Sequence, residues 1–138
     1  MVLVDSSIWI EAGRSRGDLF TKVALQSLLE ENEACWCGPV RLEVLGGSRA
    51  QERPKLLYFF SIVPYLVVGD DIWDKAKSMA WRLRDKGVNP PWNDVLIATI
   101  AQEKMCRVFA RDKHFEQMAE VLGISLYQPN YGGGYNPF

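Results

Sequence analysis

The sequence predicts an α/β protein with a central parallel sheet of four to five strands flanked by helices. Short runs of β-branched and other apolar residues alternate with longer runs in which apolar residues recur at helical spacing. No internal repeat and no linker interrupts this alternation over the 138 residues. A chain of this length with alternating strands and helices is typical of one domain built on a wound parallel sheet.

The strands are expected at short apolar segments. The first one ends just before Asp5, and the last is a short fifth strand near the C-terminus. In chain order, the predicted strands are Met1–Val4, Glu33–Cys37, Tyr65–Val68, Cys106–Ala110 and Ile124–Tyr127. We assign residues 1–127 to the domain and residues 128–138, which include three consecutive glycines, to an irregular C-terminal tail.

Helices are expected between these strands, bounded by cap residues, prolines and glycines. They run from Asp5 to near Gly13, from Asp18 to about Glu31, from Gly38-Pro39 to Gly46-Gly47, onward from Pro54, from Asp70 or Asp71 to Gly87, over residues 94–101, and from about His114 to Leu122. The helix over residues 94–101 is apolar on nearly every side, so we expect it to lie buried at the centre of the domain.

Composition and charge exclude several classes of protein. The chain is 48% apolar and 24% charged, which is typical of a soluble globular domain, and no apolar run approaches the roughly 18 residues of a transmembrane helix. The N-terminus does not resemble a signal peptide, so we expect a cytoplasmic protein with its three cysteines reduced. A net charge of −1 gives no overall basic footprint for nucleic acid, so a polyanion would need a local patch.

Four acidic residues stand beside apolar segments. Asp5 and Asp112 follow strands, Asp94 opens the buried helix, and Glu43 lies on a helix between two apolar residues. Each has a structural alternative, because the aspartates could cap helices and Glu43 could pair with a nearby arginine or face solvent. It is less probable that all four acids have such separate structural roles than that any one of them does. The carboxyl ends of parallel strands meet at one edge of a sheet, where ligand crevices lie.

Carboxylates that converge at one sheet edge predict a divalent cation. Neighbouring like charges raise one another's pKa, so four such acids cannot all stay ionised without a cation. Mg²⁺ and Mn²⁺ prefer oxygen ligands and bridge to phosphate, and such an ion can activate water for phosphodiester hydrolysis. The single histidine, His114, is equally consistent with a substrate-facing, a capping or a catalytic role.

Four short motifs resemble those of PIN-domain ribonucleases, and most closely those of the VapC toxin group of bacterial and archaeal toxin–antitoxin pairs. They are Val-Leu-Val-Asp5-Ser6-Ser7-Ile-Trp-Ile, Arg41-Leu-Glu43-Val-Leu-Gly-Gly, Asn93-Asp94-Val-Leu-Ile-Ala98 and Arg111-Asp112-Lys113-His114-Phe115. A single motif is weak, but the ordered set with its matching neighbours is fairly specific. The resemblance extends from Val2 to about Tyr127.

The resemblance implies a single PIN-like domain that cleaves RNA as a Mg²⁺- or Mn²⁺-dependent endoribonuclease. Asp5 and Asp94 would be the principal metal ligands, and Glu43 and Asp112 would complete the catalytic pocket through water or at a second metal. The resemblance also implies a homodimer without membrane association, held inactive by a small VapB-type antitoxin protein.

Polar residues beside the acids would support them. In the family pattern, Ser6 and Asn93 would orient the carboxylates by hydrogen bonding. With Asp5 taken as a ligand, capping of the following helix is expected to fall to Ser6 or Ser7. One position departs from the pattern: many members have Thr or Ser two residues before the fourth acid, where this chain has Ala110, and the missing hydroxyl weakens the case for a second metal.

Basic and aromatic residues near the acids could contact RNA. The candidates for phosphate contacts are Arg14, Arg16, Arg41, Arg49, Arg111 and Lys113, and their alternative is an ordinary mixed-charge surface. Trp92 is the best candidate for stacking on a base, although packing in the core or in a dimer is favoured for it. Trp9 and Trp81 are expected to pack.

Other classes that gather aspartates and Mg²⁺ at strand ends match less well. A HAD-like protein needs a second Asp two residues after the first, where this chain has Ser7. A receiver domain needs a pair of acids after its first strand and a nucleophilic Asp after its third, and this chain has neither. A non-catalytic PIN scaffold and a PIN nuclease in housekeeping RNA processing stay open beside the toxin, which the small single-domain size favours by analogy.

Overall fold

A computed structural model shows a four-stranded parallel sheet between layers of helices, and it describes residues 1–129. The strands are β1 (Val2–Val4), β2 (Ala34–Cys37), β3 (Tyr65–Leu66) and β4 (Arg107–Phe109). They pair in the order β3-β2-β1-β4, and every pair is parallel. The fold class predicted from the sequence is therefore confirmed.

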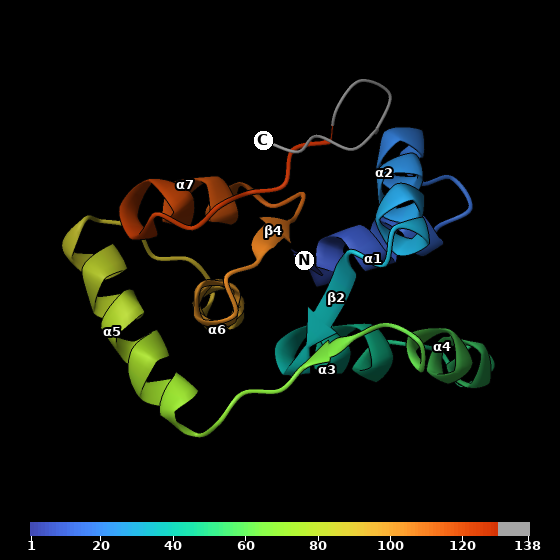
Figure 1. Cartoon of the computed structure of the whole chain (residues 1–138), viewed down its shortest axis with the longest axis horizontal. Coiled ribbons are helices and arrows are strands. Elements are labelled where there is room, and N and C mark those ends of the chain that lie inside the picture. Colours follow the sequence, from blue (N-terminus) through green and yellow to red (C-terminus); the bar gives the residue numbers. More distant parts are fainter. Residues whose placement is uncertain (130–138) are drawn as a thin grey trace.

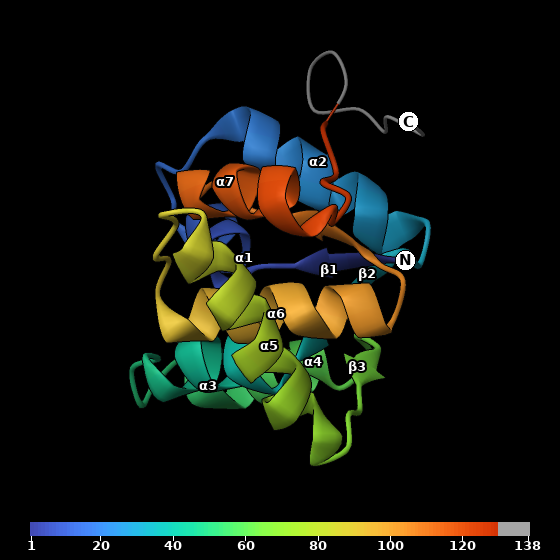
Figure 2. The same cartoon turned by 90° about the vertical axis from the view of Figure 1, so that its left-hand side faces the viewer.

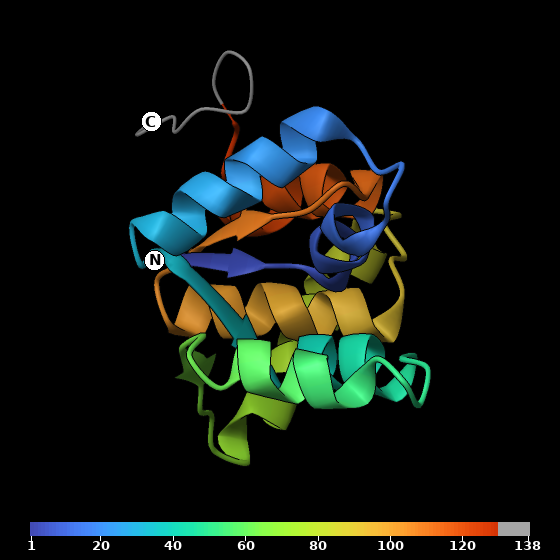
Figure 3. The same ribbon diagram turned by 90° about the vertical axis from the view of Figure 1, so that its right-hand side faces the viewer.

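The helices cover both faces of this sheet. In chain order they are α1 (Ser6–Gly13), α2 (Leu19–Glu30), α3 (Gly38–Gly46), α4 (Arg53–Phe60), α5 (Asp71–Asp85), α6 (Trp92–Glu103) and α7 (Lys113–Leu122). Helices α1 and α2 lie on one side of the strands and α5, α6 and α7 on the other (Figure 1). Figure 2 shows the second group in front, and Figure 3 shows the first.

Strand β1 and helix α6 form the centre of the core. All three residues of β1 are fully buried, and α6 is buried over most of its length, as its apolar sequence predicts. The end of β1 is fixed on two sides. The Trp9 indole donates a hydrogen bond to the Val4 carbonyl at 3.0 Å, and the Asp5 backbone N–H donates to the Phe109 carbonyl at 2.9 Å.

Two predicted strands differ from the structure by more than one residue at an end. The third ends at Leu66 rather than Val68, because its partner residue Cys37 is the last of β2 and the next residue already begins α3. The predicted fifth strand at residues 124–127 is only an isolated bridge between Val108 and Leu126. The domain boundary at residue 127 stays a prediction: residues 128 and 129 have no regular secondary structure, and residues 130–138 of the predicted tail lie outside the described part.

The buried and exposed side chains match the sequence only in part. All three cysteines are free and buried, as expected, and Trp9 packs in the core. Trp81 and Trp92 are 60% and 79% exposed, so neither packs in the core of this chain, and the predicted packing of Trp81 is wrong. For Trp92, packing in a dimer stays a prediction. Both line an open groove of about 610 Å³ between α5 and the start of α6. Within residues 1–129, no helix combines the length and the apolar character needed to cross a bilayer.

The C-terminal end of α7 offers a test of the backbone geometry. Gly123 has a φ of +74°, and a Cβ there would meet no atom within 4 Å, so only the left-handed conformation disfavours a side chain. We expect Gly123→Ala to lower the free energy of unfolding by about 1 kcal/mol. Gly13→Ala at the end of α1, where space is also open, is the control and should not destabilise. Urea denaturation measures the free energy of unfolding of both variants. Equal decreases in the two would contradict the view that the left-handed backbone at Gly123 is what disfavours a side chain.

Candidate active site

The four predicted acids line one pocket at the carboxyl edge of the sheet. The pocket has a volume of about 390 Å³ and is lined by Asp5, Ser6, Ser7, Ile10, Glu11, Arg14, Glu43, Asp94, Arg111 and Asp112. The acids come from the β1–α1 junction, helix α3, the first turn of α6 and the β4–α7 junction. Because β1, β2 and β4 are parallel, the segments that follow them leave the sheet at the same edge.

Asp5 is both the N-cap of α1 and a buried pocket residue. Its Oδ2 accepts the Ser7 backbone N–H at 3.1 Å and the Ser7 hydroxyl at 2.6 Å. Its Oδ1 is buried and has no hydrogen-bond partner among the residues that the structure describes. Burial raises the pKa of Asp5, which is only 4% exposed, while the Ser7 hydrogen bonds oppose that rise. The prediction that Ser6 or Ser7 caps this helix is wrong, because Asp5 does so.

Ser7 is the site residue that sequence reasoning missed. Its hydroxyl donates to Asp5 and also accepts the Arg111 backbone N–H at 3.1 Å. This oxygen therefore ties the β1–α1 junction to the β4–α7 junction. A hydroxyl two residues after a strand-ending aspartate is the spacing of a helix cap, so that signal was present in the sequence. Ser6 is buried at the pocket wall, and its orienting role stays a prediction.

Asp94 is held in the first turn of α6 and is 9% exposed. The N-cap of this helix is Pro91, and its first residue is Trp92, so the helix begins beside Asn93 as expected. The pKa of Asp94 is raised to about 6, first by burial and then by the charges of Asp5 and Asp112. The His114 ring opposes this rise, with its Nδ1 3.3 Å from Asp94 Oδ2.

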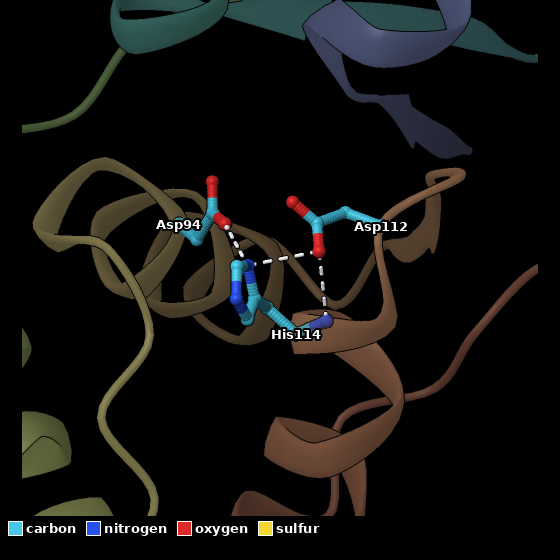
Figure 4. A group of neighbouring side chains, drawn as sticks. All are labelled: Asp94, Asp112 and His114. Atoms are coloured by element: carbon cyan, nitrogen blue, oxygen red, sulfur yellow. Dashed lines mark hydrogen bonds and ion pairs between the residues drawn. The ribbon is translucent and has the colours of Figure 1, made fainter.

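Asp112 caps α7 and lies beside the His114 ring. Its Oδ1 accepts the His114 backbone N–H at 2.9 Å and is 2.8 Å from His114 Nδ1. Figure 4 shows the carboxylates of Asp94 and Asp112 both reaching the same nitrogen of the ring. One potential ligand atom from each of the three residues lies within 4.8 Å of the other two, which is a spacing suited to a metal ion.

Glu43 reaches the pocket from α3, and Asn93 holds it there. The Asn93 side-chain amide donates a short hydrogen bond to Glu43 Oε1, which joins α3 to the start of α6. The alternative of an arginine partner is not what the structure has, since Arg49 pairs with Glu52 and Arg41 lies over the rings of Trp36 and Tyr65. The resemblance implies that Asn93 orients a carboxylate; the structure places its amide on Glu43, and the role in the site stays a prediction.

The predicted RNA contacts separate into two groups. Arg14 and Arg111 line the acidic pocket. Arg111 is already engaged, because its guanidinium donates to the Thr21 hydroxyl at 3.0 Å and lies 3.5 Å from Asp18. Arg16 and Lys113 are exposed, on the loop before α2 and at the start of α7. Arg14 also has a partner, since its guanidinium donates to Glu11 Oε2 at 3.3 Å, but its side chain is 67% exposed and that of Arg111 is 46% exposed.

A parallel α/β sheet with an acidic pocket at its carboxyl edge defines the class to which this protein belongs. Residues 2–121 match the PIN domain family, and the chain is a member of that family. Membership excludes the HAD-like and receiver alternatives.

Relatives and solved structures resemble nearly the whole chain. Ribonuclease VapC11 of Mycobacterium tuberculosis and VapC ribonuclease Mb1587 of Mycobacterium bovis are each 29% identical over 129 residues, which are 90% of this chain and 96% of theirs. VapBC2 from Rickettsia felis, bound to a DNA fragment from its promoter, has a TM-score of 0.74 at 20% identity and covers 91% of this chain and 97% of its own. FitAcB from Neisseria gonorrhoeae has a TM-score of 0.73 at 15% identity over 94% and 98%. The sarcin-ricin loop cleaving toxin VapC20 of M. tuberculosis has a TM-score of 0.67 at 20% identity over 94% and 100%.

The raised pKa of Asp94 predicts that this acid destabilises the metal-free protein. The folded chain binds a proton at Asp94 more tightly than the unfolded chain, so the stability from that proton is complete below the ordinary pKa of 3.8 and is lost as pH rises through about 6. With EDTA at about pH 7.5, we expect the free energy of unfolding of Asp94→Asn to be about 1–3 kcal/mol higher than that of wild type. Thermal unfolding should show the gain shrinking toward about pH 4.

Glu120→Gln is the control for this experiment, because Glu120 is an exposed acid on α7. Its melting temperature should follow that of wild type at each pH. An Asp94→Asn protein that is less stable than wild type near neutral pH in EDTA would show that Asp94 is held by favourable contacts instead.

Proposed function

We propose that this chain is a divalent-metal-dependent endoribonuclease and the toxin of a VapBC-type toxin–antitoxin pair, acting in the cytoplasm. The observation that carries the proposal is the pocket in which Asp5, Glu43, Asp94 and Asp112 converge. Relatives named ribonucleases at 29% identity over 90% of this chain support the nuclease activity. The VapBC2 and FitAcB structures that share the fold support the toxin–antitoxin role.

The donor set of the pocket fits a hard divalent cation. Asp5 is buried with one oxygen lacking a partner within residues 1–129, and such an oxygen is costly unless a cation or a hydrogen-bond donor meets it. Asp94 and Asp112 supply further oxygens within reach of each other. We assign Asp5 and Asp94 as the principal ligands of Mg²⁺ or Mn²⁺, with Glu43 and Asp112 completing the site through water or at a second ion.

A bound divalent cation would neutralise charge on the RNA phosphate and lower the pKa of the attacking water. The residues of this chain fix where that happens. Ser7 holds Oδ2 of Asp5, and Asn93 holds Oε1 of Glu43, so that the remaining carboxylate oxygens are free to bind. Arg14 at the rim is placed to contact a phosphate of the RNA, and such contacts position the backbone without reading its sequence.

Removal of either principal ligand is expected to abolish cleavage. Purified Asp5→Asn and Asp94→Asn proteins should cleave RNA at least about 100-fold more slowly than wild type with Mg²⁺ or Mn²⁺. EDTA should stop wild-type cleavage, and either ion should restore it. Glu120→Gln is the matched control and should cleave at the wild-type rate. A folded Asp5→Asn protein that cleaves as well as wild type would overturn the catalytic assignment, and a wild-type protein without activity would favour the non-catalytic scaffold.

The toxin role and the homodimer are tested in cells and in solution. Expression of the chain alone should arrest growth, and co-expression of the small protein encoded beside it should relieve the arrest. The Asp5→Asn chain is the control and should not arrest growth. Sedimentation of the purified chain should give the mass of a homodimer, and the antitoxin should sediment with it. An active nuclease that leaves growth unchanged would support the housekeeping role in RNA processing instead.

A further inference from the structure

We propose that His114 is a metal ligand, and that with Asp94 and Asp112 it forms a mixed nitrogen–oxygen site that prefers Mn²⁺ to Mg²⁺. The inference rests on the proposed metal-dependent function and specifies its ion. Nothing in the four acidic motifs requires a nitrogen ligand, and His114 is the only histidine of the chain.

The geometry of the three side chains places the nitrogen where a ligand is needed. His114 Nδ1 lies 2.8 Å from Asp112 Oδ1 and 3.3 Å from Asp94 Oδ2. Ligands that surround a small octahedral cation at about 2.1 Å are roughly 3 Å apart when adjacent, and both distances are close to that spacing. The side chain of His114 is 40% exposed, so an ion can reach the ring from solvent.

An independent feature of the same pocket indicates a cation. Asp5 lines the pocket with Asp94 and Asp112, and its buried Oδ1 has no partner in the part of the chain that is described. The His114 ring itself faces two carboxylate oxygens with a single nitrogen, which can donate at most one proton between them. A cation bound by that nitrogen and by the carboxylates of Asp94 and Asp112 would meet both oxygens that the ring faces, beside the pocket wall where Asp5 lies.

The identity of the donor atoms sets the preference for the ion. Mg²⁺ is bound almost entirely by oxygen, whereas imidazole nitrogen suits first-row transition metals. A purely structural role is the alternative, in which the ring only bridges α6 and α7. The cap of α7 does not depend on the ring, because Asp112 accepts the backbone N–H of residue 114. His114→Gln therefore keeps the cap while it removes the ring nitrogen and its contacts with Asp94 and Asp112.

Mn²⁺ binding to a tag-free protein tests the inference without RNA. Electron spin-echo spectroscopy of Mn²⁺ bound to wild type should show coupling to a ¹⁴N nucleus, and labelling of histidine alone with ¹⁵N should replace it by ¹⁵N coupling. His114→Gln should lose that coupling and bind Mn²⁺ about 10-fold or more weakly. Its affinity for Mg²⁺, measured by competition with Mn²⁺, should change by less than about 2-fold. Glu120→Gln should bind both ions as wild type does.

Mn²⁺ bound without histidine coupling, or bound equally by His114→Gln, would overturn the ligand assignment. Equal losses of Mg²⁺ and Mn²⁺ affinity in His114→Gln would overturn the selectivity. Either result can occur while wild type still cleaves RNA, which leaves the proposed function intact. Failure of the proposed function has a different signature, in which wild type shows histidine-coupled Mn²⁺ and cleaves no RNA.

Discussion

The repulsion among carboxylates gathered at one sheet edge is the constraint on which this structure depends. Burial raises the pKa of both Asp5 and Asp94, and for Asp94 the charges of Asp5 and Asp112 add to the effect of burial. The fold holds these acids with hydrogen bonds from Ser7 and with the ring of His114. Such contacts offset the cost only in part, because Asp5 Oδ1 has no donor among residues 1–129. An arrangement that a cation would relieve is expected of a site selected for function at the expense of stability.

The acids stay together because the two junctions that carry them are bonded to each other. The Asp5 backbone N–H donates to the carbonyl of Phe109 at the end of β4, and the Ser7 hydroxyl accepts the backbone N–H of Arg111. The β1–α1 and β4–α7 segments are far apart in sequence and cannot separate without breaking both bonds. Helix α6 then brings Asp94 into the same pocket. Because α6 is largely buried, movement of the helix would disturb the core. The position of the site thus follows from the adjacency of β1 and β4.

Alternation of strands and helices was enough to predict the sheet, because apolar periodicity reflects burial directly. That pattern does not show where a strand stops pairing with its neighbour. Val67 and Val68 are β-branched, yet β2 has no residue left to pair with them. For the site, the four acids can be predicted from strand ends and motifs. The side chains that contact each acid cannot, because those contacts depend on packing between elements far apart in the sequence. Asn93 on Glu43 and the ring of His114 between two aspartates are contacts of that kind. The exposure of Trp81 and Trp92 was missed because an aromatic residue at helical spacing looks the same in a core and on an open groove.

Helix capping does not exclude the proposed metal binding by the same residue, since a carboxylate has two oxygens. Asp5 uses Oδ2 for the N-cap of α1 and keeps Oδ1 in the pocket. Asp112 differs, because its Oδ1 both caps α7 and meets the His114 ring. A cap fixes the side-chain rotamer, and a fixed rotamer lowers the entropy that a ligand must lose when it binds an ion. In the proposed metal site the caps would therefore orient the ligands, and the strand-to-helix junction that makes Asp5 a good cap would also make it a well-placed ligand.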